Sequence, residues 1–415
     1  MVNNYDTIEL ENEIEDLSIN CSDTQIIRID KPVSYNTIFK NFIVKNRPCI
    51  IKIPSAQSWK STKEWVSQGF PHFSNLQNIY GTVTVPVADC GEKYYNVQKK
   101  QPTQFSEYLS YWEKYIKNGY PSDMPCLYLK DWHFTKDFPT HIIYEVPQYF
   151  ASDWLNEYLT SRNDINDDYR FVYLGPKGSW TPFHADVFTS FSWSINICGR
   201  KRWLLFPPGQ EDYLRDNHGN LIYDATCSDM LDNKLFPDHH KLTPYDITQE
   251  TGEAIFVPTG WHHQVWNLED TISINHNWVN GCNIENMWLS MQKNLNDVKK
   301  EIEDCQAMED WAEHCQIMLQ AVFGMNYEEF LKFIGFIAEC RLASLKTNCP
   351  IVLYGGWKLG KWHTIFDLQK INSVLRSFMT NTDVQALKFY DKSLDSLKHL
   401  CMGMEEVLGK FAIES

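Results

Sequence analysis

The most constraining feature of this chain is a series of short β-strand patterns between residues 171 and 278. In residues 192–198, Trp193, Ile195 and Ile197 alternate with polar residues, which is typical of a strand with one face on the core. Further strand patterns lie at 171–174, 202–206, 254–257 and 272–278. Turn residues rather than helical patterns separate most of these segments. Such a series predicts an antiparallel β-barrel or sandwich.

The longest interruption of this series is residues 209–250, which are polar, charged and rich in turn residues. We expect this stretch to be a long excursion over one end of the barrel. After Gly281 the apolar spacing becomes i, i+3 and i+4, which predicts a helix over 284–302. Further helical patterns cover 311–323, 327–342, 366–378 and 393–408.

The sequence before residue 171 mixes helical and strand patterns. Helices are expected at 34–43 and 105–116, strands at 49–53, 81–87 and 127–129, and a polar loop at 160–168. Pro86 places its strand at the edge of a sheet, since proline cannot donate to a ladder. We therefore expect an acidic, flexible arm over 1–25, a β domain with supporting N-terminal elements over 26–282, and a helical region over 283–415.

Composition narrows the class of protein. Of the 415 residues, 43% are hydrophobic and 15 are Trp, which indicates a globular chain. The net charge of −15 argues against direct binding to nucleic acid, because no excess of Lys and Arg is present. The 12 cysteines include no Cys-x-x-Cys, and neither a signal-peptide pattern nor a membrane-length apolar run occurs. These features predict a cytoplasmic or nuclear protein with no membrane partner.

The strongest chemical pattern lies inside the strand-rich region. His184 and Asp186 are two residues apart, so on a strand both side chains project from one face. A histidine from a distant strand would complete a set of two imidazoles and one carboxylate on one side of a metal ion. Non-haem Fe(II) oxygenases use such a set and leave the remaining positions open. A simple His–Asp hydrogen bond near a strand end is the alternative for this spacing.

Several stretches around these residues resemble the jumonji C (JmjC) family of Fe(II)- and 2-oxoglutarate-dependent oxygenases. They are Asn-Arg-Pro-Cys-Ile at 46–50, Phe-His-Ala-Asp at 183–186, Gly-Arg-Lys-Arg-Trp-Leu-Leu-Phe-Pro-Pro at 199–208 and Gly-Glu-Ala-Ile-Phe-Val-Pro at 252–258. The resemblance covers roughly residues 30–280 and implies a double-stranded β-helix, the cupin-like barrel of that family. The expected fold is then a mainly β core with α elements, N-terminal α/β support and a C-terminal helical region.

The resemblance is closer to one branch of the family. Ser-Phe-Ser-Trp-Ser at 190–194, Arg-Asp-Asn-His-Gly-Asn-Leu at 215–221 and Ile-Asn-His-Asn-Trp-Val-Asn-Gly at 274–281 look like a branch whose member is a lysyl hydroxylase of eukaryotic release factor 1. This similarity implies a protein substrate, most simply a lysine of that translation termination factor, together with Fe(II), 2-oxoglutarate, dioxygen as cosubstrate and ascorbate as supporting reductant.

The family pattern also implies roles for individual residues. His184 and Asp186 match the first two metal ligands, and the distal ligand is expected five positions after the strand-ending Pro258, which gives His263. Its neighbour His262 would pack outward, and an exchange of these two stays open. His276 is expected to be a structural histidine behind the barrel wall.

The implied cosubstrate site centres on Lys201, which lies 17 positions after His184 and matches the family lysine for the distal carboxylate of 2-oxoglutarate. Thr181 and Tyr128 resemble hydroxyl donors to the same carboxylate. Three further side chains are expected to face the barrel interior, where they bind the cosubstrate or orient a ligand: Ser194, Asn275 and Asn277.

Other functions remain open on the sequence alone. The same hydrogen-abstraction chemistry serves hydroxylases of other proteins and N-methyl-lysine demethylases. A non-catalytic cupin scaffold, or a cupin enzyme without a cosubstrate, is also compatible with the barrel pattern. The groups that bind a substrate ammonium are unassigned, and acidic residues in 129–150 and 209–250 are the candidates. The oligomeric state is open, with a dimer through the C-terminal helices as one option.

Overall fold

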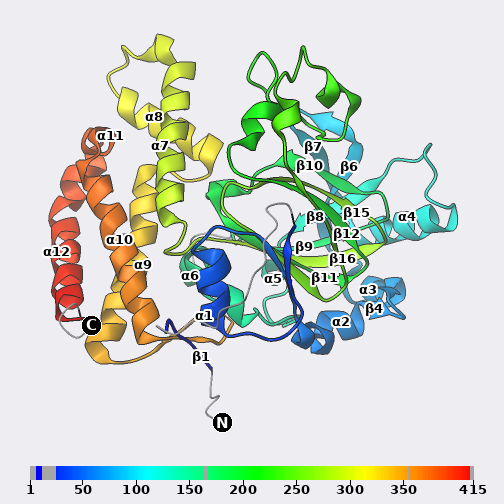
Figure 1. Ribbon diagram of the computed structural model, residues 1–415, viewed down its shortest axis with the longest axis horizontal. Helices are drawn as coiled ribbons and strands as arrows, with labels where there is room; N and C mark the ends of the chain where they lie inside the picture. Colours follow the sequence, from blue (N-terminus) through cyan, green and yellow to red (C-terminus); the bar gives the residue numbers. More distant parts are fainter. Residues whose placement is uncertain (1–5, 12–24, 163, 165–166, 354, 412–415) are drawn as a thin grey trace.

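The computed structural model describes residues 6–11, 25–162, 164, 167–353 and 355–411. Its core is two β-sheets packed face to face (Figure 1). The C-terminal helices, yellow to red, stand to the left of the sheets, and short N-terminal helices, blue to cyan, lie below and to the right. The larger sheet has the order β2 (Ile27–Ile29), β3 (Cys49–Lys52), β14 (Glu253–Val257), β11 (Phe191–Cys198), β16 (Thr271–Trp278), β9 (Arg170–Gly175), β8 (Leu127–Trp132), β6 (Thr84–Tyr94) and β7 (Val97–Gln104). The smaller sheet has the order β10 (Trp180–His184), β15 (His262–Asn267), β12 (Lys201–Phe206) and β13 (Tyr245–Gln249).

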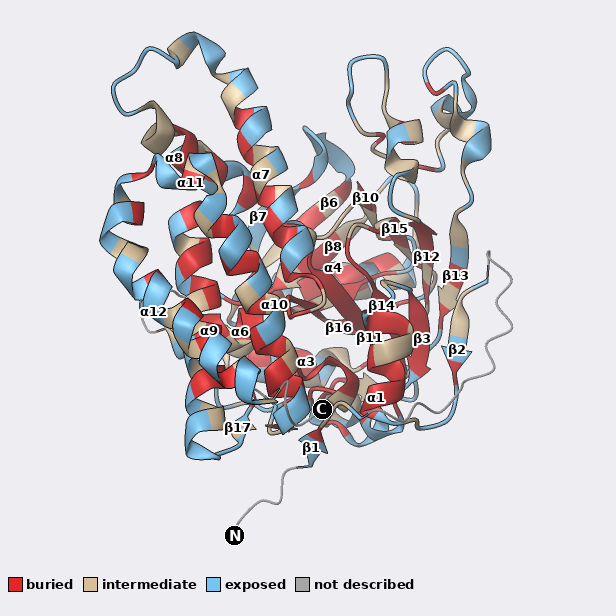
Figure 2. Ribbon diagram, turned by 60° about the vertical axis from the view of Figure 1, so that its left-hand side comes forward, coloured by how far each residue is buried: buried red, intermediate tan, exposed pale blue. Residues whose placement is uncertain are grey.

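The middle of the larger sheet is buried on both faces, as the red strands of Figure 2 show. Along β11, the apolar set Trp193, Ile195 and Ile197 packs into the main hydrophobic core. The alternate residues face the smaller sheet, and Ser194 lies opposite Asn275 of β16 in the ladder. Polar residues are therefore enclosed between the two sheets, which is where the site forms. The expected β core of cupin type is confirmed by this architecture.

The part of the chain that precedes β9 contains several short helices. They are α1 (Tyr35–Ile38) followed by a π-helical turn at Phe39–Ile43, α2 (Lys60–Glu64), α3 (Phe73–Tyr80), α4 (Phe105–Lys117), α5 (Phe134–Asp137) and α6 (Trp154–Ser161), with β4 (Val66–Ser67) and β5 (Phe70–Pro71) as a small hairpin. The expected helix at 105–116 is confirmed. Helix α6 was not expected, and it includes the first two residues of the predicted loop at 160–168.

The C-terminal region is helical, as expected. It consists of α7 (Ile284–Glu301), α8 (Trp311–Phe323), α9 (Tyr327–Thr347), α10 (Lys361–Thr380), α11 (Thr382–Gln385) and α12 (Lys388–Phe411). The side chains of α6 share one hydrophobic cluster with these helices, through Trp154 and Leu155. Arg341 of α9 reinforces this contact, because its guanidinium binds Glu157 of α6 at 2.6 and 2.8 Å and Asp367 of α10 at 2.9 Å.

The N-terminal segment contributes a strand to a small sheet that it forms with the C-terminal region. β1 (Thr7–Ile8) pairs in parallel with β18 (Lys358–Leu359), which also pairs with β17 (Ile351–Val352). Ile8 is buried, and the Glu9 carboxylate accepts a hydrogen bond from the backbone N–H of His363 at 3.0 Å. Glu9 thereby caps α10, whose own first residue is preceded by a glycine without a capping side chain. Residues 7–9, expected to belong to a flexible arm over 1–25, are instead paired or hydrogen-bonded to the C-terminal region. Residues 1–5 and 12–24 of the expected arm lie outside the described ranges.

Two strand expectations need correction. The strand containing Pro86 is not an edge, because β6 lies between β8 and β7. Pro86 is tolerated there because β8 pairs only from Val87 onward, and the residue opposite Pro86 on β7 is Pro102. The excursion at 209–250 contains 3-10 turns at Gln210–Leu214, Ser228–Leu231 and His239–Lys241, and it ends in β13, a strand that the polar composition concealed.

Candidate functional site

Three predicted residues come together between the two sheets. His184 ends β10, and its ladder partner across the antiparallel pair is His263 of β15, with the two ring centroids 4.3 Å apart. Asp186 follows two residues later in extended conformation, so its side chain stays on the same face. One possible ligand atom from each of the three lies within 4.8 Å of the others. Among the described residues, this is the one group of three such side chains placed to hold a metal ion.

The hydrogen bonds of the imidazoles suit metal binding. His184 Nδ1 lies 2.7 Å from the carbonyl of Pro182, and His263 Nδ1 lies 3.0 Å from the carbonyl of Trp261. A carbonyl only accepts, so both rings carry their proton on Nδ1 and leave the Nε2 lone pair for a ligand. Asp186 accepts a 2.6 Å hydrogen bond from Ser192. Burial and the neighbouring His263 lower the pKa of His184 to about 4, which keeps the ring neutral.

These donors fit Fe(II). Two neutral imidazoles and a carboxylate on one side are the facial set that leaves coordination positions open toward a cavity. A cavity of about 300 Å³ lies on that side, and His184, Asp186 and His263 all line it. His262 does not line the cavity. It lies against the ring of Phe183, at 5.4 Å between centroids, and its Nδ1 is 3.8 Å from Glu211. His263, and not His262, is therefore the histidine that lies beside His184 and Asp186 in the cavity.

Lys201 occupies the inner part of the same cavity. Its ammonium is buried and donates to Ser273 Oγ at 2.7 Å, with Tyr128 OH at 3.5 Å. Burial lowers its pKa to about 7, and among the described residues it forms no ion pair with a carboxylate. A buried ammonium that lines a cavity without a counter-ion fits an anionic ligand, since a carboxylate there would restore the charged form.

The remaining predicted residues divide into two groups. Thr181, Tyr128, Asn275 and Asn277 line the cavity with Lys201, as expected. Gly175 makes room for Tyr128, because a Cβ at that position would lie 2.4 Å from the tyrosine ring. Ser194 does not line the cavity. It donates to Asn275 Oδ1 at 3.0 Å, so its contact is with a cavity residue and not with the cavity itself.

Several residues in or beside the cavity were not among the predicted site residues. Ser273 does not line the cavity, but it accepts a hydrogen bond from the Lys201 ammonium. It shares a strand face with Asn275 and Asn277, so strand alternation was sufficient to find it. Lys130 lies two residues after Tyr128 and was detectable in the same way. Asp131 was not detectable, because it reaches the cavity through a local irregularity of β8. Gln98 was not detectable either, because it lies on β7, whose sequence has no strand pattern. No described residue of 209–250 lines the cavity.

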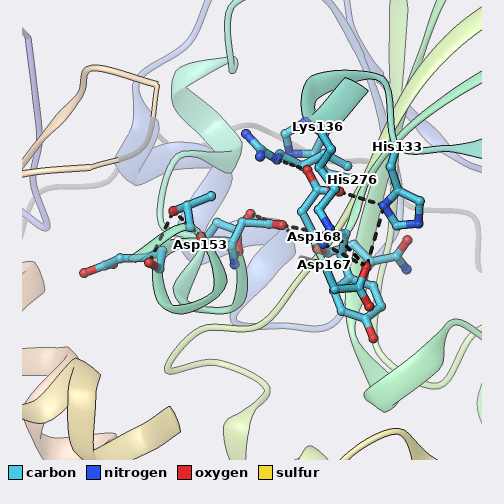
Figure 3. Close-up of polar contacts among 12 residues, drawn as sticks. His133, Lys136, Asp153, Asp167, Asp168 and His276 are labelled. Atoms are coloured by element: carbon cyan, nitrogen blue, oxygen red, sulfur yellow. Dashed lines mark hydrogen bonds and ion pairs between the residues drawn. The ribbon is translucent and has the colours of Figure 1, made fainter. Parts of the chain in front are cut away.

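His276 lies outside the cavity, as expected for a structural histidine. Its ring stacks on Trp193 at 4.3 Å between centroids, and its Nε2 is 2.6 Å from Tyr144 OH. Figure 3 shows it beside a polar cluster centred on Asp168, whose carboxylate binds His133 at 2.8 Å and Arg170 at 2.7 Å. The partners of Asp168 satisfy its buried charge, which indicates a structural cluster.

The described part of the chain has no helix that is both long and apolar enough to cross a membrane. Residues 35–284 match the family model described as a cupin-like domain. The chain is 47% identical over 377 residues to the 2-oxoglutarate and iron-dependent oxygenase JMJD4 of Danio rerio, covering 88% of this chain and 89% of the relative. The JMJD4 of Homo sapiens is 49% identical over 355 residues, covering 85% and 84%.

A relative with another printed activity is also similar. The arginine-specific demethylase JMJ20 of Arabidopsis thaliana is 40% identical over 328 residues, covering 75% of this chain and 70% of that protein. All three comparisons span the strands that carry the three-residue metal arrangement and Lys201. The chain therefore belongs to the cupin-like JmjC family of 2-oxoglutarate- and iron-dependent oxygenases.

Proposed function

We propose that this oxygenase is a protein hydroxylase whose substrate is a lysine side chain of eukaryotic release factor 1. The observation that carries the proposal is the shared cavity of the His184–Asp186–His263 arrangement and the buried Lys201. The similarity to the JMJD4 oxygenases and the branch-like motifs at 190–194, 215–221 and 274–281 support this choice of substrate.

The roles of the residues follow from their contacts. His184, Asp186 and His263 would hold Fe(II), with the imidazole tautomers fixed by the carbonyls of Pro182 and Trp261. Lys201 would bind the distal carboxylate of 2-oxoglutarate. Ser273 links Lys201 to Asn275, because its hydroxyl accepts from the ammonium and donates to Asn275 Oδ1 at 3.1 Å. This chain of hydrogen bonds holds both side chains in place before the ligand binds.

When bound, iron and 2-oxoglutarate would supply the oxidation of a C–H bond with dioxygen, and ascorbate would keep the metal reduced. The protein positions the target carbon and shields the reacting centre from water. The cavity reaches the surface, since two of the residues that line it, Val97 and Val187, are 57% and 52% exposed. An opening of this kind is compatible with a side chain presented by a folded protein. We also propose a cytoplasmic location, where translation termination takes place.

The second candidate is demethylation of an N-methylated side chain. The similarity to a relative named as an arginine-specific demethylase favours it. Hydroxylation of an N-methyl carbon begins with the same hydrogen abstraction, so the metal arrangement serves both reactions equally. The two functions differ in the product, which is a stable alcohol in one case and formaldehyde with a demethylated side chain in the other.

The test incubates the enzyme with Fe(II), ascorbate, 2-oxoglutarate and recombinant release factor 1, followed by tandem mass spectrometry of the release factor. We expect one lysine to gain a single oxygen atom with the wild type and with His262→Ala, and not with His184→Ala. Conversion of 2-oxoglutarate to succinate without modification of the release factor would reject this substrate. Formaldehyde release from methylated peptides would favour the demethylase. Neither turnover nor modification by the iron-loaded protein would favour a binding scaffold.

A further inference from the structure

The wall of the cavity contains an irregular strand. Along β8, Leu129 pairs with Leu174 and Trp132 pairs with Val172, so β8 has one residue more than β9 between these pairs. Asp131 takes up this irregularity with a φ of 60°, a left-handed conformation that is unfavourable for a residue other than glycine. As a consequence, the consecutive residues Lys130 and Asp131 both line the cavity, whereas strand alternation would turn one of them away.

Asp131 is the carboxylate of this wall that is not part of the metal arrangement. Among the described residues, the acidic side chains that line the cavity are Asp131 and Asp186. Asp186 faces the metal position and accepts from Ser192. Asp131 is therefore the acidic group that the cavity offers to a cationic substrate.

A lysine of the protein itself already binds this carboxylate. The ammonium of Lys100, from β7, forms an ion pair with Asp131, and Tyr173 OH donates to the other carboxylate oxygen at 2.5 Å. Lys100 lines the same cavity. Its side chain is 42% exposed and that of Asp131 is 31% exposed, so solvent reaches the pair. Burial raises the pKa of Asp131, but Lys100 and Lys130 outweigh burial and lower it, which keeps the carboxylate charged.

The second lysine of the wall is bound elsewhere. Lys130 is buried, and its ammonium donates to Gln98 Oε1 at 2.9 Å. The cation that neutralises Asp131 by contact is thus Lys100, which comes from the outermost strand of the larger sheet. A side chain on an edge strand with solvent access is free to leave the carboxylate at small cost, because an exposed ion pair contributes little stability.

We propose that Asp131 binds the side-chain ammonium of the substrate lysine, and that Lys100 occupies this position until the substrate displaces it. This inference rests on the proposed function and names the recognition residue of the same site. The exchange replaces one lysine ammonium by another, so charge and hydrogen-bond geometry at Asp131 are preserved. Tyr173 keeps the carboxylate oriented in both states. Lys100 acts as a competitor whose removal should favour substrate binding.

The test measures the KM for release factor 1 and the KM for 2-oxoglutarate in matched variants. Asp131→Asn keeps the shape of the side chain and removes its charge, and we expect the KM for the release factor to rise by about tenfold or more. Lys100→Met removes the competitor, and we expect that KM to fall. The matched controls are Lys99→Met on the same strand, whose ion pair with Glu92 is exposed, and Asp246→Asn, whose ion pair with Arg202 lies outside the cavity.

The opposite shifts of the two test variants are the signature of the proposal. A structural role of the Lys100–Asp131 pair would instead move both variants in the same direction. Binding of the release factor to the Mn(II)-loaded enzyme, measured by calorimetry, gives a readout independent of turnover and should follow the same order. An unchanged KM and affinity in Asp131→Asn, with lysine hydroxylation by the wild type intact, would overturn this inference alone. Turnover of 2-oxoglutarate by a wild type that modifies no lysine would overturn it together with the proposed substrate.

Discussion

The buried ion network around Arg341 allows a quantitative test of how the helical region is attached. The side chains of Arg341 and Asp367 are fully buried, and Glu157 is 14% exposed. Replacing Arg341 by Met keeps an unbranched side chain of similar volume. It removes the guanidinium from Glu157 and from Asp367, and His363, 3.2 Å from Asp367, is then the basic side chain that still contacts this carboxylate. Removal of one partner from a buried ion network costs about 3–5 kcal/mol. We expect a loss of this size in the free energy of unfolding.

The loss is expected to depend on pH. Burial raises the pKa of Asp367, but His363 and Arg341 outweigh burial and lower it below its ordinary value. A depressed carboxyl pKa contributes stability above the unfolded pKa of about 3.9, and this stability is lost as pH falls through the folded pKa. Without Arg341, protonation of Asp367 removes a buried charge that has lost its guanidinium partner. The difference between variant and wild type should therefore be full near pH 7 and shrink below about pH 5.

The measurement is urea unfolding monitored by circular dichroism at several pH values. Arg376→Met is the matched control, since Arg376, on α10, also binds a carboxylate, Glu405 at 2.6 Å, but its side chain is 62% exposed. An exposed pair contributes about 0–1 kcal/mol. The triple variant Glu157→Gln, Arg341→Met, Asp367→Asn should regain much of the stability, because no unpaired charge stays buried. Equal losses for Arg341→Met and Arg376→Met would refute the reasoning.

The remaining predictions concern the cavity. Lys201→Met is expected to weaken 2-oxoglutarate binding by about tenfold or more in calorimetry with Mn(II), whereas Arg202→Met, on the opposite strand face, should not. Lys201→Met should also stabilise the ligand-free protein. The pKa of Lys201 is about 7 in the fold and about 10.4 in the unfolded chain, so keeping this ammonium charged costs the folded protein roughly 4–5 kcal/mol. Between these two pH values the folded wild type binds fewer protons than the unfolded chain, so its stability rises with pH. The extra stability of Lys201→Met should therefore be full below pH 7 and vanish above about pH 10.5. An extra stability independent of pH would contradict the lowered pKa of Lys201. His263→Ala should abolish stoichiometric Mn(II) binding and His262→Ala should retain it, as metal analysis after dialysis would test; the reverse result would assign the ligand to His262.

Much of the fold was predictable because the relevant patterns are local. Alternation over 192–198 and 272–278 gave two central strands, and the helical spacing after Gly281 gave most of the C-terminal helices. The metal arrangement was predictable because His184 and Asp186 share one segment. The resemblance to a family then provided the distal histidine and Lys201, which no spacing within one strand identifies.

The rest depends on contacts between distant segments. Asp131 reaches the cavity only because β8 is irregular, and no glycine or other turn residue in the sequence indicates this irregularity. Strand β7 consists largely of Lys, Gln and Thr, and it forms because β6 provides a partner. Ser194 was assigned to the right strand face, but Asn275 lies between it and the cavity. Local patterns thus predicted which face a side chain takes, while the packing of neighbours decided which residues line the site.

The pairing of β1 with β18 has a consequence for synthesis in the cell. Thr7 leaves the ribosome about 350 residues before its ladder partner Lys358, which corresponds to roughly 20 to 70 s at usual elongation rates. Glu9 must then reach the start of α10, where Gly360 leaves room for its carboxylate; a Cβ there would lie 2.2 Å from Glu9 Oε2. The barrel strands emerge entirely within this interval. All strands of the two core sheets therefore leave the ribosome while the N-terminal strand still lacks its partner, and β18 with the start of α10 then holds it in place.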